Sequence, residues 1–424
     1  MGKQKIVLFP SGFIPSIVLG LYFSVAAINQ AFLEYIPKVA GLSLMSFLYL
    51  GFGAVLLLSV ASNIFKKSVI NPNAIFCLLF VSLLYGITAL HFERTTLDFI
   101  EFLIYVFLPI LFVSCVKVNV KVMIIASIIA PCVTIFNINS IFALREYTNN
   151  ISMGTSYAFL FPIICTVAYL FKYFKKESLS KKIVIIPFLI INFIAFVFIF
   201  LHGSRGPLLC VAIVILLLAT FEVKDNNGIR MKNKISFIFI SISLLIVIAF
   251  IWEILSGLNA ILLRNGYDVN FIRKLLELKS ENDVLNGRNV EYSSALQGIW
   301  DKPFFGHGMS SFTYYTGYAY PHNFLLQLAY DGGLLVFIMF LIPFIKGFYR
   351  FAKQCNSSEF VFGVVLFAYA IPSSLFTGDL WKKPILWGLF AFLLFFVDGK
   401  KSQIMNGEVN IENARFLKEN TVSK

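Results

Sequence analysis

The residues best suited to chemistry in this chain lie in three short groups, and the first runs from His202 to Pro207. Within it, Gly206 lets backbone come close to a ligand, and Arg205 carries a fixed positive charge. Pro207 suits the first turn of a helix, where backbone N–H groups attract anions. The candidates for this anion site are His202, Ser204, Arg205 and Gly206. The plainer alternative is a tight turn whose arginine extends to the surface.

The second group begins at Arg288, directly after Asn286 and Gly287. An amphipathic helix is expected after it, with one apolar face formed by Val290, Ala295, Leu296, Ile299 and Trp300. Such an interfacial helix would present Arg288 towards the membrane; the alternative is a surface helix with no ligand. The turn that follows contains His307, a further candidate for substrate contact. A second amphipathic piece is expected at 268–279, with its apolar side formed by Ile272, Leu275 and Leu276.

The third group is Tyr320-Pro321-His322-Asn323, which leads into an apolar run containing Asp331. Histidine is the side chain most easily poised as a base near neutral pH, so His322 is a candidate catalytic base and Asn323 a candidate substrate contact. The alternative is a hydrogen-bonded structural histidine. Asp331 lies well inside the apolar run, where a carboxylate must be paired or hydrogen-bonded, and we interpret it as structural.

Membrane helices must position these groups, because the composition excludes a soluble protein. The 424 residues are 58% hydrophobic and 13% charged, with a mean hydropathy of +0.82. A soluble globule needs more polar surface than this. The apolar runs are continuous over about 17–25 residues, which is typical of transmembrane helices and not of barrel strands. The expected fold class is therefore an all-α, polytopic integral membrane protein.

The runs predict about twelve transmembrane helices. They cover residues 8–32, 40–62, 73–91, 99–116, 120–144, 153–173, 183–201, 206–222, 235–255, 323–345, 360–377 and 384–397. We expect transmembrane helices 1–9 in 1–255, one large loop with amphipathic helices in 256–322, transmembrane helices 10–12 in 323–397 and a polar tail in 398–424.

Charge sets the expected orientation. Lysines cluster at alternate connections, near 3–5, 66–67, 117–121, 172–182, 224–234 and 346–353, whereas the other connections are nearly neutral. The positive-inside rule then places both termini in the cytoplasm and the large loop outside. This distribution also accounts for the net charge of +13 without nucleic-acid binding.

Six of the nine arginines fall on the expected outer side: Arg94, Arg145, Arg205, Arg264, Arg273 and Arg288. Lysine would satisfy the charge rule equally well, so the outer arginines need another reason. The planar guanidinium grips phosphate with two hydrogen bonds, which suits an anionic substrate. Arg145 and Arg264 are therefore added to the candidate substrate-binding residues, although some outer arginines could simply cap helices or meet lipid head groups.

The sequence lacks the patterns of nucleotide and metal sites. It contains no Walker-type loop, no HExxH and no His/Cys/Asp cluster with metal spacing. Five of the six cysteines lie in apolar runs, and we expect neither disulfides nor a cofactor. An enzyme facing outward without ATP needs a donor that is already activated, and a lipid-linked pyrophosphate meets that need.

The three groups, in this order, resemble the O-antigen ligase and polymerase superfamily of bacterial envelope glycosyltransferases. The matching motifs are Ser204-Arg205-Gly206, then Gly287-Arg288 with Trp300, Pro303 and Gly306-His307-Gly308, then His322-Asn323 with Gly332-Gly333. The resemblance covers about 200–345, and Asp331 stands where many relatives carry Glu. It implies a GT-C-like helical enzyme in the bacterial inner membrane, with its active site facing the periplasm.

By this resemblance the donor is an undecaprenyl-pyrophosphate-linked oligosaccharide, transferred without a metal and with inversion. Arg205 and Arg288 would hold the pyrophosphate leaving group, and His322 would accept the proton of the attacking sugar hydroxyl. The acceptor is either a lipid-linked repeat unit, as in a polymerase with a chain-length regulator as partner, or lipid A-core, as in a ligase. The Phe, Ile, Asn and Lys bias is typical of the AT-rich genes of polymerases, which favours a polymerase.

Two other classes fit part of the pattern. A transporter of lipid-linked glycans would also have about twelve spans and outward cations, but transporters usually contain an internal repeat, and no repeat relates the two halves here. A non-catalytic scaffold in an envelope complex would not need the Arg and His residues.

Overall fold

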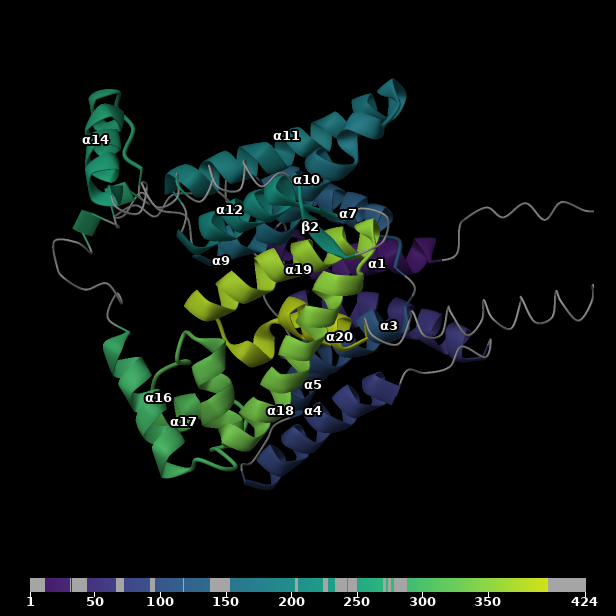
Figure 1. Ribbon diagram of the computed structural model, residues 1–424, viewed down its shortest axis with the longest axis vertical. Helices are drawn as coiled ribbons and strands as arrows, with labels where there is room; N and C mark the ends of the chain where they lie inside the picture. The colour runs from purple at the N-terminus through teal and green to yellow at the C-terminus, as the bar shows by residue number, and fades with distance from the viewer. Residues whose placement is uncertain are drawn as a thin grey trace, which may run out of the picture.

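The computed structural model describes residues 12–30, 32, 44–65, 72–91, 96–116, 118–137, 153–202, 205–223, 228–232, 242, 250–269, 272–273, 276–277 and 288–395. Regular structure in these residues is almost entirely helical (Figure 1). The exception in the part described is a hairpin of β1 (Phe221–Val223) and β2 (Ile229–Met231), paired antiparallel with Phe221 opposite Met231. The polar tail at 398–424 lies outside the described residues.

The apolar runs before residue 222 fold as helices. They are α1 (Phe13–Phe23) with α2 (Val25–Gln30), α3 (Leu44–Phe65), α4 (Pro72–His91), α5 (Thr96–Phe102) with η1 (Leu103–Phe107) and α6 (Leu108–Cys115), α7 (Val120–Ile129) with η2 (Ala130–Asn137), α9 (Met153–Ala158) with α10 (Leu160–Lys172), η3 (Phe174–Lys176), α11 (Leu179–His202) and α12 (Arg205–Thr220). Helices satisfy all backbone hydrogen bonds within the segment, which an apolar environment requires.

The second half contains the helices that carry the second and third groups. They are α14 (Ile251–Arg264), α16 (Asn289–Asp301), α17 (Phe312–Thr316), α18 (Phe324–Gln354), α19 (Ser357–Phe376), η4 (Leu380–Lys382) and α20 (Pro384–Phe395). Most of the expected ninth run lies outside the described residues. Helix α14 begins near its end and continues through Arg264, across the expected start of the large loop at 256.

Several helices are suited to a membrane. Within the described residues, four helices are long and apolar enough to cross one: Met153–Lys172, Leu179–Leu201, Phe324–Gln354 and Ser357–Phe376. Shorter apolar helices accompany them, and α11 exposes Leu179, Ile183, Val184 and Phe193 as expected of a face that meets lipid. The protein is therefore a helical membrane protein, while the count of twelve spans stays a prediction.

Close helix packing builds the core. Helices α1 and α7 approach so closely that a Cβ at Gly20 would lie 2.4 Å from the carbonyl oxygen of Met123. Small residues allow this approach in membrane helices, where dispersion contacts drive association. The fully buried Trp387 of α20 stacks against Trp381 and donates to the Leu380 carbonyl at 3.1 Å. This packing fixes the connection between α19 and α20, which borders the site described below.

The lysine-bearing connections that the structure describes gather at one end of the helices, whereas those near 3–5 and 66–67 lie outside the described residues. Lys121 pairs with Glu177, which joins the start of α7 to the connection between α10 and α11. The hairpin β1–β2 contacts α18 and α19, and a Cβ at Gly228 would lie 2.3 Å from the Lys353 carbonyl oxygen. The structure therefore agrees with the alternation of charge along the chain; which end faces the cytoplasm stays a prediction.

Candidate active site

The backbone around His322 is held in an unusual conformation. His322 has a φ of 50°, in the left-handed region that few residues other than glycine adopt. Asn323 follows as the N-cap of α18, and its Oδ1 accepts from the N–H groups of Leu325 at 2.9 Å and Leu326 at 3.3 Å. Because the cap fixes the start of α18, the imidazole of His322 is positioned at the helix N-terminus. Only the side-chain nitrogen of Asn323 is then left for a substrate.

Helix α16 lies along the first turns of α18. Ala295 and Phe312 pack against Tyr330 of α18, and Gly298 is so close to that ring that a Cβ would lie 2.1 Å from it. The Gly298 contact fixes the two helices side by side. Arg288, the N-cap residue of α16, and Glu291, in its first turn, are thereby brought to His322.

The expected apolar face of α16 is wrong in detail. Ala295 and Ile299 do pack inward, but Val290, Leu296 and Trp300 are exposed, Trp300 at 80%. The reason is the close approach at Gly298, which turns the narrow Ala295–Gly298 side toward α18 and directs the larger apolar residues outward. These exposed residues suit contact with lipid or substrate more than with the core.

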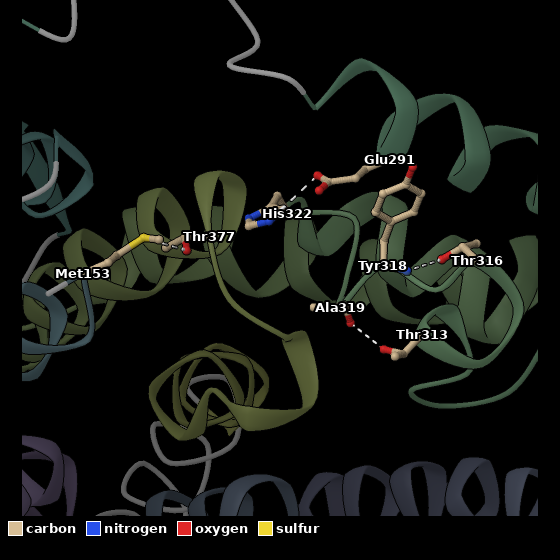
Figure 2. Close-up of polar contacts among 8 residues, drawn as sticks. All are labelled: Met153, Glu291, Thr313, Thr316, Tyr318, Ala319, His322 and Thr377. Carbon is tan, nitrogen blue, oxygen red and sulfur yellow. Dashed lines mark hydrogen bonds and ion pairs between the residues drawn. The ribbon is translucent and has the colours of Figure 1, made fainter.

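Glu291 faces the imidazole of His322 directly (Figure 2). Oε2 of Glu291 lies 3.8 Å from Nε2 of His322, which is an ion-pair distance but too long for a hydrogen bond. The same view shows Thr377, at the end of α19, whose hydroxyl donates to the sulfur of Met153 of α9 at 3.7 Å. The site thus draws on α9, α16, α18 and α19.

The surroundings of His322 keep its imidazole neutral. Burial, followed by the positive charges of Arg288 and Lys383, lowers the pKa of His322 from 6.5 to about 4. A neutral imidazole has a free lone pair at neutral pH, which a general base needs. At the same time both neighbouring cations are charges that an anionic substrate would neutralise.

Lys383, just before α20, is a residue of this cluster that sequence reasoning missed. Its Nζ donates to the Ser373 carbonyl at 2.6 Å, to Ser373 Oγ at 3.3 Å and to the Thr377 carbonyl, so it caps the end of α19. Burial lowers the pKa of Lys383 to about 7, although Cys210 and Asp379 oppose the shift. The signal was present in the sequence, because a lysine in this connection breaks the expected near-neutrality of the outer side.

Tyr157 of α9 connects the first motif to the other two. A Cβ at Gly206, in the first turn of α12, would lie 1.8 Å from the Tyr157 hydroxyl oxygen. The charge of Arg288 and the phenol of Tyr320 both act on Tyr157. Tyr157 therefore lies close both to the start of α12 and to Arg288, which neighbours His322. No sequence pattern singled out Tyr157.

The Gly-His-Gly turn has a structural role at a break in α18. Gly333 has φ 69° and ψ 178°, which interrupts the helix. The turn fills the break: the N–H groups of His307 and Gly308 donate to the carbonyls of Tyr330 at 2.9 Å and Asp331 at 2.7 Å. Leu334 in turn donates to the Pro303 carbonyl at 2.7 Å. The second and third motifs are thus joined by backbone hydrogen bonds.

Asp331 is structural, as predicted. It is fully buried, and Oδ2 accepts from Trp381 Nε1 at 2.6 Å and from the Ser310 N–H at 3.2 Å. Oδ1 accepts from Ser311 Oγ at 3.3 Å. These bonds tie α18 to the connection after α19 and to the large loop.

The remaining candidates divide into three sets. Arg145 and Ser204 lie outside the described residues. Helix α11 ends at His202 and α12 begins at Arg205, but the side chains of these two residues also lie outside the described part. His307 stacks on Tyr330 at 4.5 Å, and its Nε2 lies 2.9 Å from the Gly298 carbonyl, which suits a positioning role. Arg264 is exposed at the end of α14 and is not among the charges that act on His322.

One further outer arginine has a protein partner. Arg273 donates to Asp268 at 2.5 Å and lies 3.6 Å from Glu277. Val269 and Ile272 are buried beside Leu255 of α14, so the piece expected at 268–279 does present an apolar side. Leu275 lies outside the described residues. Arg273 is therefore a stabilising residue of the loop.

A cavity of about 390 Å³ opens beside the turn at 303–308. Leu84 and Thr88 of α4 form one wall, and Phe305, His307 and Tyr315 contribute to the other. Neither Arg288 nor His322 lines it. In the part of the chain that the structure describes, no group of three or more His, Cys, Asp or Glu residues could hold a metal ion.

Together, the fold and the site define a helical membrane protein with a neutral histidine set among cations, an arrangement suited to chemistry on an anionic substrate. Residues 190–341 match the family model of the O-antigen ligases, a region that contains all three motifs. This match supports the O-antigen polymerase and ligase superfamily that the motifs predicted. The family indicates an enzyme of the glycosyltransferase type that acts on lipid-linked glycans in O-antigen assembly. None of the curated proteins matches the chain.

Proposed function

We propose that this protein is an O-antigen polymerase, which transfers an undecaprenyl-pyrophosphate-linked glycan to a hydroxyl group of a lipid-linked repeat unit at the periplasmic face of the inner membrane. The observation that carries the proposal is the cluster of Arg288, His322 and Lys383 beside the start of α12. A neutral imidazole next to cations matches a reaction that needs one base and an anionic leaving group.

The proposed reaction is a single displacement. The acceptor hydroxyl oxygen attacks the anomeric carbon, its proton passes to His322, and the bond to the pyrophosphate oxygen breaks with its electron pair. Arg288, with Arg205 from the first motif, stabilises the negative charge that develops on the pyrophosphate. Direct displacement inverts the configuration at the anomeric carbon, and this chemistry needs no metal.

Donor binding would also activate the base. The charges of Arg288 and Lys383 help to keep the pKa of His322 at about 4 in the substrate-free site. A bound pyrophosphate compensates these charges, so the pKa of His322 should rise toward its ordinary value. The base becomes stronger when the leaving group is in place, which limits reaction to the occupied site.

Complementation tests this proposal. In a polymerase-deletion strain, the wild-type gene should restore a ladder of surface glycan on a gel, whereas His322→Ala and Arg288→Ala should give a single repeat unit on core at normal protein levels. We expect each variant to transfer on the order of 10²–10³-fold more slowly. Arg288→Lys should not restore the ladder, because an ammonium cannot form the two-pronged contact.

Arg264→Ala is the matched control, since it removes an outer arginine that is not among the charges acting on His322, and its ladder should resemble that of the wild type.

The family's description as O-antigen ligase favours lipid A-core as the alternative acceptor. If the gene gives no ladder but restores glycan attachment in a ligase-deletion strain, the ligase function is correct. Wild-type ladders from both catalytic variants would refute the assignment of His322 and Arg288.

A further inference from the structure

Glu291 approaches the candidate base from the helix that carries Arg288. Its Oε2 lies 3.8 Å from Nε2 of His322, and both side chains are less than a fifth exposed. Oε2 of Glu291 and Nδ1 of His322 are buried, and neither atom has a hydrogen-bond partner among the described residues. A buried carboxylate oxygen without a donor is unfavourable, which points to a partner that is completed during the reaction.

The other groups around the ring are cationic or aromatic. Arg288 at the start of α16 and Lys383 before α20 act on His322 with positive charge, and the ring of Tyr320 lies 4.5 Å from the imidazole. Glu291 is the carboxylate that faces the ring from α16. It is therefore placed to balance a positive charge that appears on the imidazole.

We propose that Glu291 is the positioning residue for His322: its carboxylate, 3.8 Å from Nε2, orients the imidazole so that Nε2 receives the proton of the acceptor hydroxyl. This inference rests on the proposed function. In the transfer step the hydroxyl proton moves to Nε2, the oxygen forms its bond to the anomeric carbon, and the pyrophosphate departs with the electron pair of the broken bond. Glu291 stays ionised and stabilises the imidazolium.

The gap between the two side chains must close for a hydrogen bond to form during the proposed reaction. At 3.8 Å Glu291 does not offset the two cations, and closing by about 1 Å would form a charge-assisted hydrogen bond. Catalytic hydrogen bonds are often long in substrate-free sites and shorten in the loaded complex. When the donor's pyrophosphate occupies the cations, the attraction between Glu291 and the protonating imidazole increases.

The test compares Glu291→Gln with Asp301→Asn, which removes the same charge from the exposed far end of α16. Purified variants are assayed in proteoliposomes against lipid-linked glycan extracted from a strain that lacks this gene. Glu291→Gln should lower kcat about 10- to 100-fold with little change in KM, and should move the acid limb of kcat to lower pH, because the imidazolium loses its carboxylate partner. Asp301→Asn should match the wild type in rate and pH profile.

Glu291→Asp keeps the charge on a shorter side chain and should recover part of the rate; it also serves if the glutamine variant does not fold. The inference is overturned if kcat of Glu291→Gln falls at the same low pH as kcat of the wild type. It is also overturned if both Glu291 variants lose the same activity and the pH at which kcat falls does not change. His322→Ala separates the two hypotheses. An active His322→Ala refutes the proposed function, whereas an inactive His322→Ala with fully active Glu291→Gln refutes the role of Glu291 alone.

Discussion

At the scale of single residues, the site is defined by the charges near His322. Burial, followed by the charges of Arg288 and Lys383, keeps its imidazole neutral, and Oε2 of Glu291 lies 3.8 Å from Nε2. Lys383 itself is engaged with three oxygen acceptors at the end of α19. Lys383 therefore caps a helix and adds positive charge near the histidine only while it is protonated, since its pKa is about 7. Arg288, which stays charged, is the cation best placed to contact the leaving group.

The pKa of His322 leads to a prediction about activity. An imidazole with its ordinary pKa of 6.5 would lose about tenfold of its basic form between pH 7.5 and 5.5. Since the pKa of His322 is about 4, the free enzyme keeps its base over that range. The value of kcat/KM for the donor, which reports the free enzyme, should thus be flat from pH 7.5 to 5.5.

This profile is measured with the proteoliposome assay, and samples returned to pH 7.5 serve as the control for irreversible loss. A tenfold fall centred near pH 6.5 would mean that the imidazole titrates as in water, contrary to the structure.

At the scale of elements, a broken helix and the turn that fills it join two motifs that are distant in the chain. The turn at 303–308 bonds to the carbonyls exposed by the break at Gly333, and α16 is held against the same segment by Gly298. Gly306 and Gly333, one from each motif, are therefore explained by close backbone packing. Their effect on chemistry is indirect, through the position of Arg288 and Glu291.

Gly333→Ala should destabilise the protein. The position has φ 69°, and a Cβ would lie 2.3 Å from the Phe304 carbonyl oxygen, which is backbone and cannot rotate away. Strain of this kind costs about 1–3 kcal/mol before the clash is counted. We expect a lower thermal midpoint in detergent and a weaker glycan ladder.

Gly257→Ala is the matched control, because Gly257 lies inside α14 and a Cβ there would meet nothing within 4 Å. This alanine should leave the midpoint unchanged or raise it, since replacing a helical glycine stabilises by about 0.4–1 kcal/mol. Equal midpoints for the two variants would show that the turn does not depend on the break at Gly333.

At the scale of the whole molecule, the described lysine-bearing connections occupy one end and the Arg–His cluster lies away from them, as Figure 1 shows for α16 and the hairpin. The separation matches the positive-inside rule. We predict that the cluster faces the periplasm, where lipid-linked glycan is assembled.

Cysteine labelling tests this orientation. In a variant whose six native cysteines are replaced, Ser293→Cys on α16 and Ser178→Cys between α10 and α11 place single thiols at exposed positions. A membrane-impermeant maleimide should label the first in cells with a permeable outer membrane, and the second only after the inner membrane is opened. The reverse pattern would invert the topology.

The sequence by itself determined the class of protein and the position of its motifs along the chain. Continuous apolar runs must become helices, because a helix satisfies its backbone hydrogen bonds locally, and this rule needs no knowledge of neighbours. His322 and Arg288 were candidates because of their residue types and their places beside the apolar runs, while their roles at an anionic leaving group came from the resemblance and stay predictions. The structural role of Asp331 followed from the cost of a carboxylate in an apolar run.

Only the tertiary structure decided which side chains meet. Glu291, Lys383 and Tyr157 come from three separate helices or connections, and their approach to His322 or Arg288 depends on packing at Gly206 and Gly298. The two-glycine turn likewise acquired its role from a helix break elsewhere in the chain. Local sequence specifies each element through short-range hydrogen bonds, whereas the site depends on contacts between residues far apart in sequence, which no single segment encodes.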